Sequence, residues 1–298
     1  MNQTLQSRVA AGLAQAVAEP VRLFAERLAQ EAGALAALFY GSNLRTRSLD
    51  GVLDFYLLLP GGVETGIWPR VSYHEWPHEG LVLRAKVATM TLATFRAAAA
   101  GELLDTTIWA RFVQPGALVW SRDAETGGQV AGAIACAAVT AARLAVALGP
   151  ERGRAEDYWR ALFRATYKAE FRVEKPGRED SILAANRAHF DGLLPLALVA
   201  AAIPFEERDG VLAPRLDGAE RWTIRHWWRR RRRLGKPYNL VRLLRASATF
   251  EGAARYAAWK VERHTGVPVK LTPWRERHPV LAAPGVLWRV WRARRNAS

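Results

Sequence analysis

The chain has 298 residues, half of them hydrophobic and 24% charged, which is the balance of a globular protein long enough to bury a core. This composition excludes a chain that is disordered throughout. The single cysteine, Cys136, excludes a disulfide framework and a cysteine-rich zinc site, and it favours a reducing compartment.

Positive charge is concentrated toward the carboxyl end. The formal net charge is +15, from 43 Lys and Arg against 28 Asp and Glu. Residues 221–298 hold 20 of the basic residues, three acidic ones and seven of the twelve tryptophans, a local charge of +17, whereas residues 1–220 sum to −2. The basic character therefore belongs to one segment.

Apolar spacing predicts the elements of the first half. Residues 5–32 are expected to form an amphipathic helix interrupted near Pro20. Residues 35–60 read as a strand, a turn with a short helix, and a second strand. A loop rich in Gly, Pro and His follows over 61–80, then a strand over 81–90, a helix over 91–101 and a strand over 118–120.

The second half is predicted to be mainly helical, with successive helices from residue 130 to about 198. Residues 130–149 have the length of a membrane span, but Arg143 within this run favours a buried helix. Residues 204–220 read as a small hairpin or a linker. We expect domain boundaries near residues 125 and 215.

A Gly-Ser turn followed by an acidic strand is the most informative motif. Gly41 and Ser42 follow one apolar run, and Asp54 lies twelve residues after the serine in the next. Glycine lets the backbone approach a triphosphate, amides and a hydroxyl hold phosphate oxygens, and a carboxylate positions Mg²⁺. The pattern resembles that of nucleotidyltransferases, although Tyr56 stands where the usual second acid would be. The alternative is an ordinary turn and an aspartate that pairs with an arginine.

Further blocks make the resemblance more specific. Taken in order, the stretches FYGSNLRTRS, LDFYLLLP, LRAKVATM, ARFVQP, ATYKAEFR and YNLVRLLRASATFEGAARYAAWKVERH resemble the mitochondrial translocator-maintenance family of CTP:phosphatidate cytidylyltransferases and its bacterial relatives. The similarity spans about residues 38–264, and that family also has a single aspartate followed by hydrophobic residues. The resemblance implies an α/β nucleotidyltransferase fold with a mixed sheet, Mg²⁺ as cofactor, and synthesis of CDP-diacylglycerol and pyrophosphate from CTP and phosphatidate.

The same resemblance assigns roles to individual residues. The expected catalytic residues are Asp54, Ser42 and Lys86, and the expected nucleotide-binding residues are Tyr40, Gly41, Ser42, Lys86 and Arg111. The lipid phosphate is assigned to Tyr167, Lys168 and Arg172, and the metal to Asp54. Because Tyr56 replaces the usual second acid, Glu170 and Asp50 are the candidates for a further metal ligand. The chain departs from the family after Lys86, where Val and Ala replace Tyr and Gly, and at Ala169 and Glu170, which replace Gly and Asp.

Two histidines suggest a different site. His74 and His78 have the four-residue spacing of a helical zinc pair, with Glu75 and Glu79 beside them. Pro77 and Gly80 argue against a helix, so we favour a mobile loop that covers the nucleotide.

The basic segment suggests a membrane surface. Arginine contacts phosphate and tryptophan lies in the interfacial layer of a bilayer. The expected membrane-binding residues are Trp227, Trp228, Arg229, Arg230, Arg231, Arg232, Arg233, Trp288 and Trp291. Single-stranded nucleic acid is the less favoured partner, because apolar residues accompany the arginines downstream. The structural alternative is a core-packing helix followed by a solvated tail.

Together these features predict a cytidylyltransferase bound peripherally to a membrane. The cytoplasmic face is expected because the first twenty residues lack a secretory signal. Residues 1–125 are expected to form a nucleotidyltransferase domain with an amino-terminal helix, 126–215 a helical domain that completes the active site, and 216–298 a basic, membrane-associating region. The alternatives are transfer to another lipid phosphate or to RNA, or an assembly factor that has lost the chemistry.

Overall fold

A five-stranded mixed sheet lies at the centre of the fold. The computed structural model describes residues 3–66, 70–169, 177–249, 252–269, 271–277, 285 and 288. The strands are β1 (Ala36–Tyr40), β2 (Leu53–Leu59), β3 (Arg70–His78), β4 (Leu81–Thr91) and β5 (Gly116–Ser121), in the order β3-β4-β2-β1-β5. Strands β2 and β4 run parallel and the other neighbours are antiparallel. The protein is therefore mixed α/β, as predicted.

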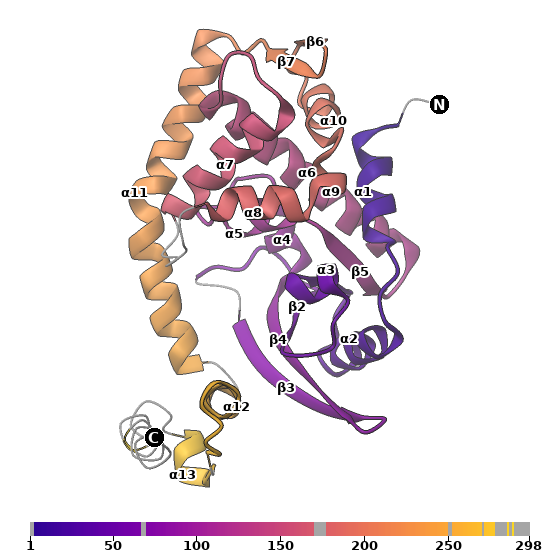
Figure 1. Ribbon diagram of the computed structural model, residues 1–298, viewed down its shortest axis with the longest axis vertical. Coiled ribbons are helices and arrows are strands. Elements are labelled where there is room, and N and C mark those ends of the chain that lie inside the picture. Colours follow the sequence, from indigo (N-terminus) through magenta and orange to yellow (C-terminus); the bar gives the residue numbers. More distant parts are fainter. Residues whose placement is uncertain are drawn as a thin grey trace.

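Helices cover both faces of the sheet (Figure 1). Helix α2 (Glu19–Glu31) begins with Pro20 in its first turn, and its Phe24 packs on one face against Phe55. The other face packs against α4 (Leu92–Ala99), α5 (Thr107–Phe112) and α6 (Ala124–Leu148), which share one hydrophobic cluster with β1 and β2. Helix α1 (Leu5–Leu13) lies against α6, and residues 14–18 separate it from α2.

Helix α6 is the central helix of the molecule. It is apolar and long enough to cross a bilayer, but 72% of its most apolar stretch of 18 residues is buried inside the protein. Its many alanines allow α5 and α7 (Ala155–Ala169) to pack closely on it. The prediction of a buried helix is confirmed.

The prediction of a loop over residues 61–80 is wrong for residues 70–78, whereas residues 61–66 are irregular as predicted. Residues 70–78 form β3, which pairs with β4 across a two-residue turn at Glu79 and Gly80, both with positive φ. Such a turn matches the twist of a hairpin. Pro77 is accommodated because β3 is an edge strand.

Short helices and a hairpin follow α7. They are α8 (Arg178–Ala185), α9 (Arg187–Phe190) and α10 (Leu193–Ala200), then β6 (Phe205–Arg208) paired with β7 (Val211–Pro214). The second pair forms the small hairpin expected in this region. Helix α3 (Ser42–Thr46) is the short helix expected between the first two strands.

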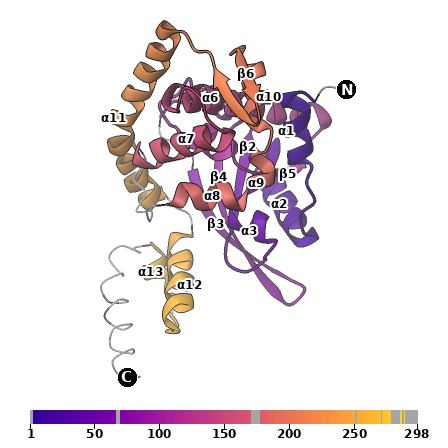
Figure 2. The same cartoon turned by 45° about the horizontal axis from the view of Figure 1, so that its top comes forward.

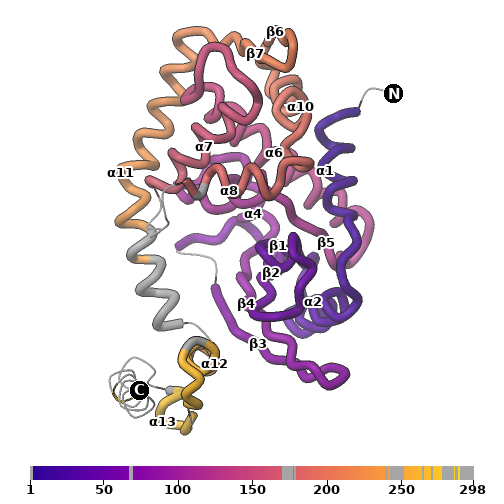
Figure 3. Tube along the Cα trace, in the orientation of Figure 1, coloured from indigo at the N-terminus to yellow at the C-terminus, as the bar shows by residue number. Residues whose placement is uncertain are grey.

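The basic segment begins as one long helix. Helix α11 (Gly218–Thr249) lies along α6 and α7, and α12 (Ala253–Thr265) contacts β3 and α13 (Pro273–Arg277). Figure 2 shows α11 on one side of the helical layer, and Figure 3 shows the same arrangement as a tube along the Cα trace.

Candidate functional site

A row of polar side chains crosses the sheet where β1 ends and β2 begins. Tyr40 is paired with Asp54, Asp54 with Lys86, and Lys86 with Tyr73. Directly paired residues point to the same face of a sheet, and this is the face covered by α4, α5 and α6. The predicted residues Tyr40, Asp54 and Lys86 are therefore neighbours.

The turn after β1 passes directly beside the Asp54 carboxylate. Gly41 has φ 94° and ψ −162°, a conformation essentially restricted to glycine. A Cβ atom at this position would lie 3.1 Å from Asp54 Oδ2. Ser42 follows and is exposed, and its hydroxyl donates to Asn43 Oδ1 over 3.3 Å. Glycine is thus required both for the turn and for the approach to Asp54.

Asp54 is a half-buried acid beside two cations. Burial raises the pKa of its carboxyl above the ordinary value, while the charges of Lys86 and Arg111 act in the opposite direction. The Arg111 guanidinium also lies 4.7 Å from the centre of the Tyr40 ring. A carboxylate whose charge is disfavoured by burial gains from a nearby cation. This part of the predicted site is assembled in the structure.

A cavity of about 310 Å³ opens beside the Gly41 turn. Arg45, Arg47 and Arg111 give it three guanidinium groups, and none of the described residues that line it is acidic. Guanidinium groups bind phosphate through paired hydrogen bonds. The complete lining consists of Gln15, Tyr40, Gly41, Ser42, Leu44, Arg45, Arg47, Ala110, Arg111, Gln114, Pro115, Phe163, Thr166, Tyr167, Ile182 and Asn186.

Arg45 and Arg47 are absent from the predicted site. Both lie just after the Gly-Ser turn, within the stretch NLRTRS. Their closeness in sequence to this turn could have identified them. Helix α3 begins directly after Gly41, and both arginines line the same cavity as the turn.

The residues predicted to bind the lipid phosphate are only partly placed. Tyr167 lines the cavity and its ring stacks on Phe163, with the two centroids 6.4 Å apart. Lys168 is exposed and is not among the lining residues, so the structure does not support its predicted role. Glu170 and Arg172 lie outside the described residues.

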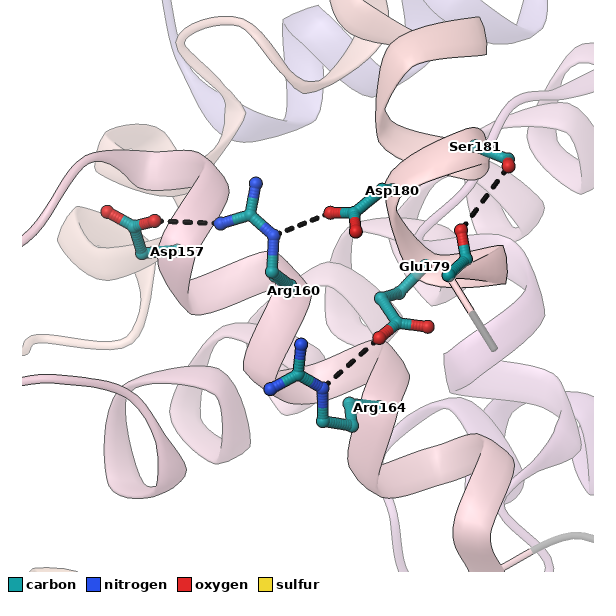
Figure 4. Close-up of polar contacts among 7 residues, drawn as sticks. Asp157, Arg160, Arg164, Glu179, Asp180 and Ser181 are labelled. Carbon is teal, nitrogen blue, oxygen red and sulfur yellow. Dashed lines mark hydrogen bonds and ion pairs between the residues drawn. The ribbon is translucent and has the colours of Figure 1, made fainter. Parts of the chain in front are cut away.

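Ion pairs hold α8 at the edge of the cavity. Figure 4 shows Arg160 and Arg164 of α7 directed toward the first turn of α8. Arg160 Nε lies 2.6 Å from Asp180 Oδ1, and Arg164 Nε lies 3.1 Å from Glu179 Oε1. These contacts anchor the helix whose Ile182 forms part of the cavity wall.

The acidic groups fit a metal bound partly by substrate. Among the described residues there is no cluster of three or more His, Cys, Asp or Glu side chains. Asp50 is exposed and does not line the cavity, whereas Tyr56 is buried between Tyr40 and Phe112. Mg²⁺ commonly uses one or two carboxylates together with substrate phosphates. Asp54 therefore fits such a site only with a phosphorylated ligand.

The two histidines lie on a strand, which corrects the prediction of a mobile loop. His74 Nε2 is 2.8 Å from Ser72 Oγ, and the His78 ring stacks on Trp76 at 4.4 Å. A strand also removes the helical geometry on which the zinc hypothesis depends.

Three predicted membrane-binding residues face the protein instead. Trp228 is 4% exposed, and the Trp227 indole donates to the Gly101 carbonyl. Arg231, 6% exposed, donates to the carbonyl oxygens of Gly101 and Leu103 at 2.5 and 2.7 Å. The prediction is therefore wrong for these three side chains, because they dock α11 on the core.

The other described residues of the predicted membrane-binding set are exposed to solvent. Arg229, Arg230, Arg232 and Arg233 are exposed on α11. Trp288 is also exposed, and Trp291 lies outside the described residues.

The chain matches no protein-family model and no curated protein. Its fold and site define a mixed α/β protein with a basic cavity next to a half-buried carboxylate.

Proposed function

We propose that the protein is a nucleotidyltransferase that joins CTP and phosphatidate to give CDP-diacylglycerol and pyrophosphate. The observation that carries this proposal is the convergence of Arg45, Arg47 and Arg111 on a cavity beside the Gly41 turn and Asp54. Three cations suit a triphosphate and an acceptor phosphate. The choice of cytidine and of phosphatidate rests on the family resemblance.

The reaction needs positioning and charge neutralisation more than covalent chemistry by the protein. An oxygen of the acceptor phosphate forms a bond to the α-phosphorus of CTP. The bond between the α-phosphorus and the oxygen that bridges it to the β-phosphorus breaks, and pyrophosphate leaves with the electron pair of that bond. The arginines hold the phosphates, and Lys86 offsets charge near the bond that breaks. Mg²⁺ held by Asp54 and the triphosphate would supply further charge neutralisation.

The outer face of α11 supports association with an anionic bilayer. Arg229, Arg230, Arg232 and Arg233 are exposed there, and Trp222 and Leu234 are 61% and 43% exposed. Basic residues that accompany apolar side chains on one helix favour an anionic lipid surface. A peripheral position would bring the protein to the membrane that contains a lipid acceptor.

A second candidate function is nucleotide binding without turnover. It is favoured by the core position of Tyr56, which leaves Asp54 without a second acid two residues later on the same strand face. This version of the protein would be a membrane-associated assembly factor.

The test is transfer of label from CTP to lipid. Purified protein is incubated with radiolabelled CTP, Mg²⁺ and mixed micelles that contain phosphatidate, and label is measured in the organic phase. We expect wild-type turnover and a loss of at least 100-fold in Asp54→Asn. The matched control is Asp209→Asn in the exposed turn between β6 and β7, where positive φ suits asparagine.

Each outcome distinguishes the candidates. Full activity of Asp54→Asn would contradict the role of this carboxylate. CTP binding by wild-type protein without product from phosphatidate, another lipid phosphate or RNA would favour the second candidate.

A further inference from the structure

A second cavity, of about 400 Å³, lies beside the basic one. It is open to solvent on one side and is lined by residues of α1, α5, α6, α9 and the start of α10. Much of its wall is apolar, including Val9, Leu13, Phe112, Ile134, Ala138 and Leu193. Its volume is within the range of small-molecule sites, about 300–1,000 Å³.

Arg8 and His189, two polar side chains that line this cavity, are engaged with backbone carbonyls. Arg8 Nη2 donates to the carbonyls of Ala188 and Asp191 at 3.0 and 3.2 Å. A ring nitrogen of His189 lies 2.9 Å from the Val113 carbonyl. With these polar groups held by the backbone, the cavity favours an apolar occupant.

The two cavities are immediate neighbours. Gln15, Gln114 and Pro115 line both of them. The side-chain amide of Gln15 donates to the Gly116 carbonyl, and the side-chain amide of Gln114 donates to the Ala110 carbonyl. A basic cavity and an apolar one that lie side by side match a molecule with an anionic head and a hydrocarbon tail. Neither a free nucleotide nor a nucleic acid has a hydrocarbon chain to fill the apolar half.

We infer that the apolar cavity binds one acyl chain of the lipid whose phosphate occupies the basic cavity. This inference rests on the lipid acceptor in the proposed function and adds a binding site for its tail. The small residues Gly12 and Ala138 then set how much chain the cavity accepts.

Filling the cavity tests the inference. A Cβ atom at Gly12 meets no heavy atom within 4 Å, and leucine is a better helix former than glycine, so Gly12→Leu is compatible with α1. Ala138→Leu fills the cavity from α6. The matched control is Gly128→Leu, which is also on α6, also has open space, and does not line the cavity.

The readout is binding, measured by calorimetry without CTP. The probes are decanoyl lysophosphatidate, below its micelle concentration, and glycerol 3-phosphate, which has the same head and no chain. We expect wild-type protein and Gly128→Leu to bind the decanoyl ester at least tenfold more tightly than glycerol 3-phosphate. Gly12→Leu and Ala138→Leu should lose most of this preference while retaining affinity for glycerol 3-phosphate.

The inference and the proposed function fail in different ways. No chain preference in wild-type protein, or the same preference in both filled variants, would overturn the inference. A preference that the filled variants lose would support it even if phosphatidate and CTP gave no product, and that lack of product would count against the proposed function alone.

Discussion

At the scale of single residues, Gly41 is the most constrained position of the site. Its backbone conformation and the 3.1 Å approach of a Cβ atom to Asp54 Oδ2 both oppose a side chain. We predict that Gly41→Ala lowers the free energy of unfolding by about 1–3 kcal/mol and reduces cytidylyltransfer at least tenfold, since the turn and the carboxylate must move apart.

Urea unfolding and kcat/KM for CTP measure the two effects of Gly41→Ala. Gly132→Ala is the control, because that glycine is helical with open space around it, and the change should be neutral or stabilising by up to about 1 kcal/mol. Wild-type activity of Gly41→Ala would show that the turn is not part of the site.

The sequence predicted the site best where chemistry and strand position coincide. Asp54, near the start of β2, is paired with Lys86 in the middle of β4. Arg45 and Arg47 escaped prediction because a basic residue in a polar turn resembles a solvated one. Lys168 shows the converse: it is adjacent to Tyr167 in sequence, yet consecutive helical residues point in different directions, and only Tyr167 lines the cavity.

At the scale of elements, His189 links α9 to the end of α5 and makes their packing sensitive to pH. Burial lowers the pKa of His189; the hydrogen bond to the Val113 carbonyl opposes this shift, and the charge of Arg8 adds to it. The folded state therefore binds fewer protons than the unfolded chain, whose histidine has a pKa of about 6.5. Stability should fall as the pH is lowered through this value and should level off below the pKa of the folded state.

Urea midpoints at several pH values between about 5 and 7.5 test this linkage. We expect His189→Gln, which keeps a hydrogen-bond donor, to flatten the decline toward acid. Its midpoint at neutral pH reports whether the fold is intact. Parallel pH profiles for the variant and wild type would exclude His189 as the source.

Elements with a clear apolar pattern were predicted well, whereas the edge strand β3 was not. Helices α2 and α6 carry clear apolar patterns, and Pro20 marks the start of α2. Strand β3 has exposed and half-buried residues along most of its length because it is an edge strand. Its sequence therefore resembles a loop, and pairing with β4 decides its structure.

At the scale of the whole molecule, α11 turns the side chains of the arginine run both toward the core and toward solvent. Five consecutive arginines look equivalent in sequence, but helical geometry turns Arg231 inward and leaves its neighbours exposed. Its guanidinium lies 3.8 Å from the centre of the Trp227 ring. Burial, with a smaller effect from Arg230, lowers the pKa of Arg231 to about 10, so it remains charged at neutral pH.

Substitution on the two sides of α11 should therefore separate stability from membrane binding. Arg231→Met leaves the carbonyls of Gly101 and Leu103 without this donor, and we predict a loss of about 2–3 kcal/mol in the free energy of unfolding. Folded Arg231→Met should still bind anionic vesicles as wild type does. Replacing Arg229, Arg230, Arg232 and Arg233 together by serine should change stability by no more than about 0.5 kcal/mol per site.

The serine variant should instead lose vesicle binding at least 100-fold, because each basic residue near an anionic surface is worth about 1 kcal/mol. Sedimentation with phosphatidylserine vesicles at low and high salt measures this loss, and the wild-type affinity should fall as salt screens the surface. Neutral vesicles provide the reference. Unchanged sedimentation of the serine variant would show that these four arginines of α11 do not bind the membrane. The structural role of Arg231, which holds the helix to the core, would still stand.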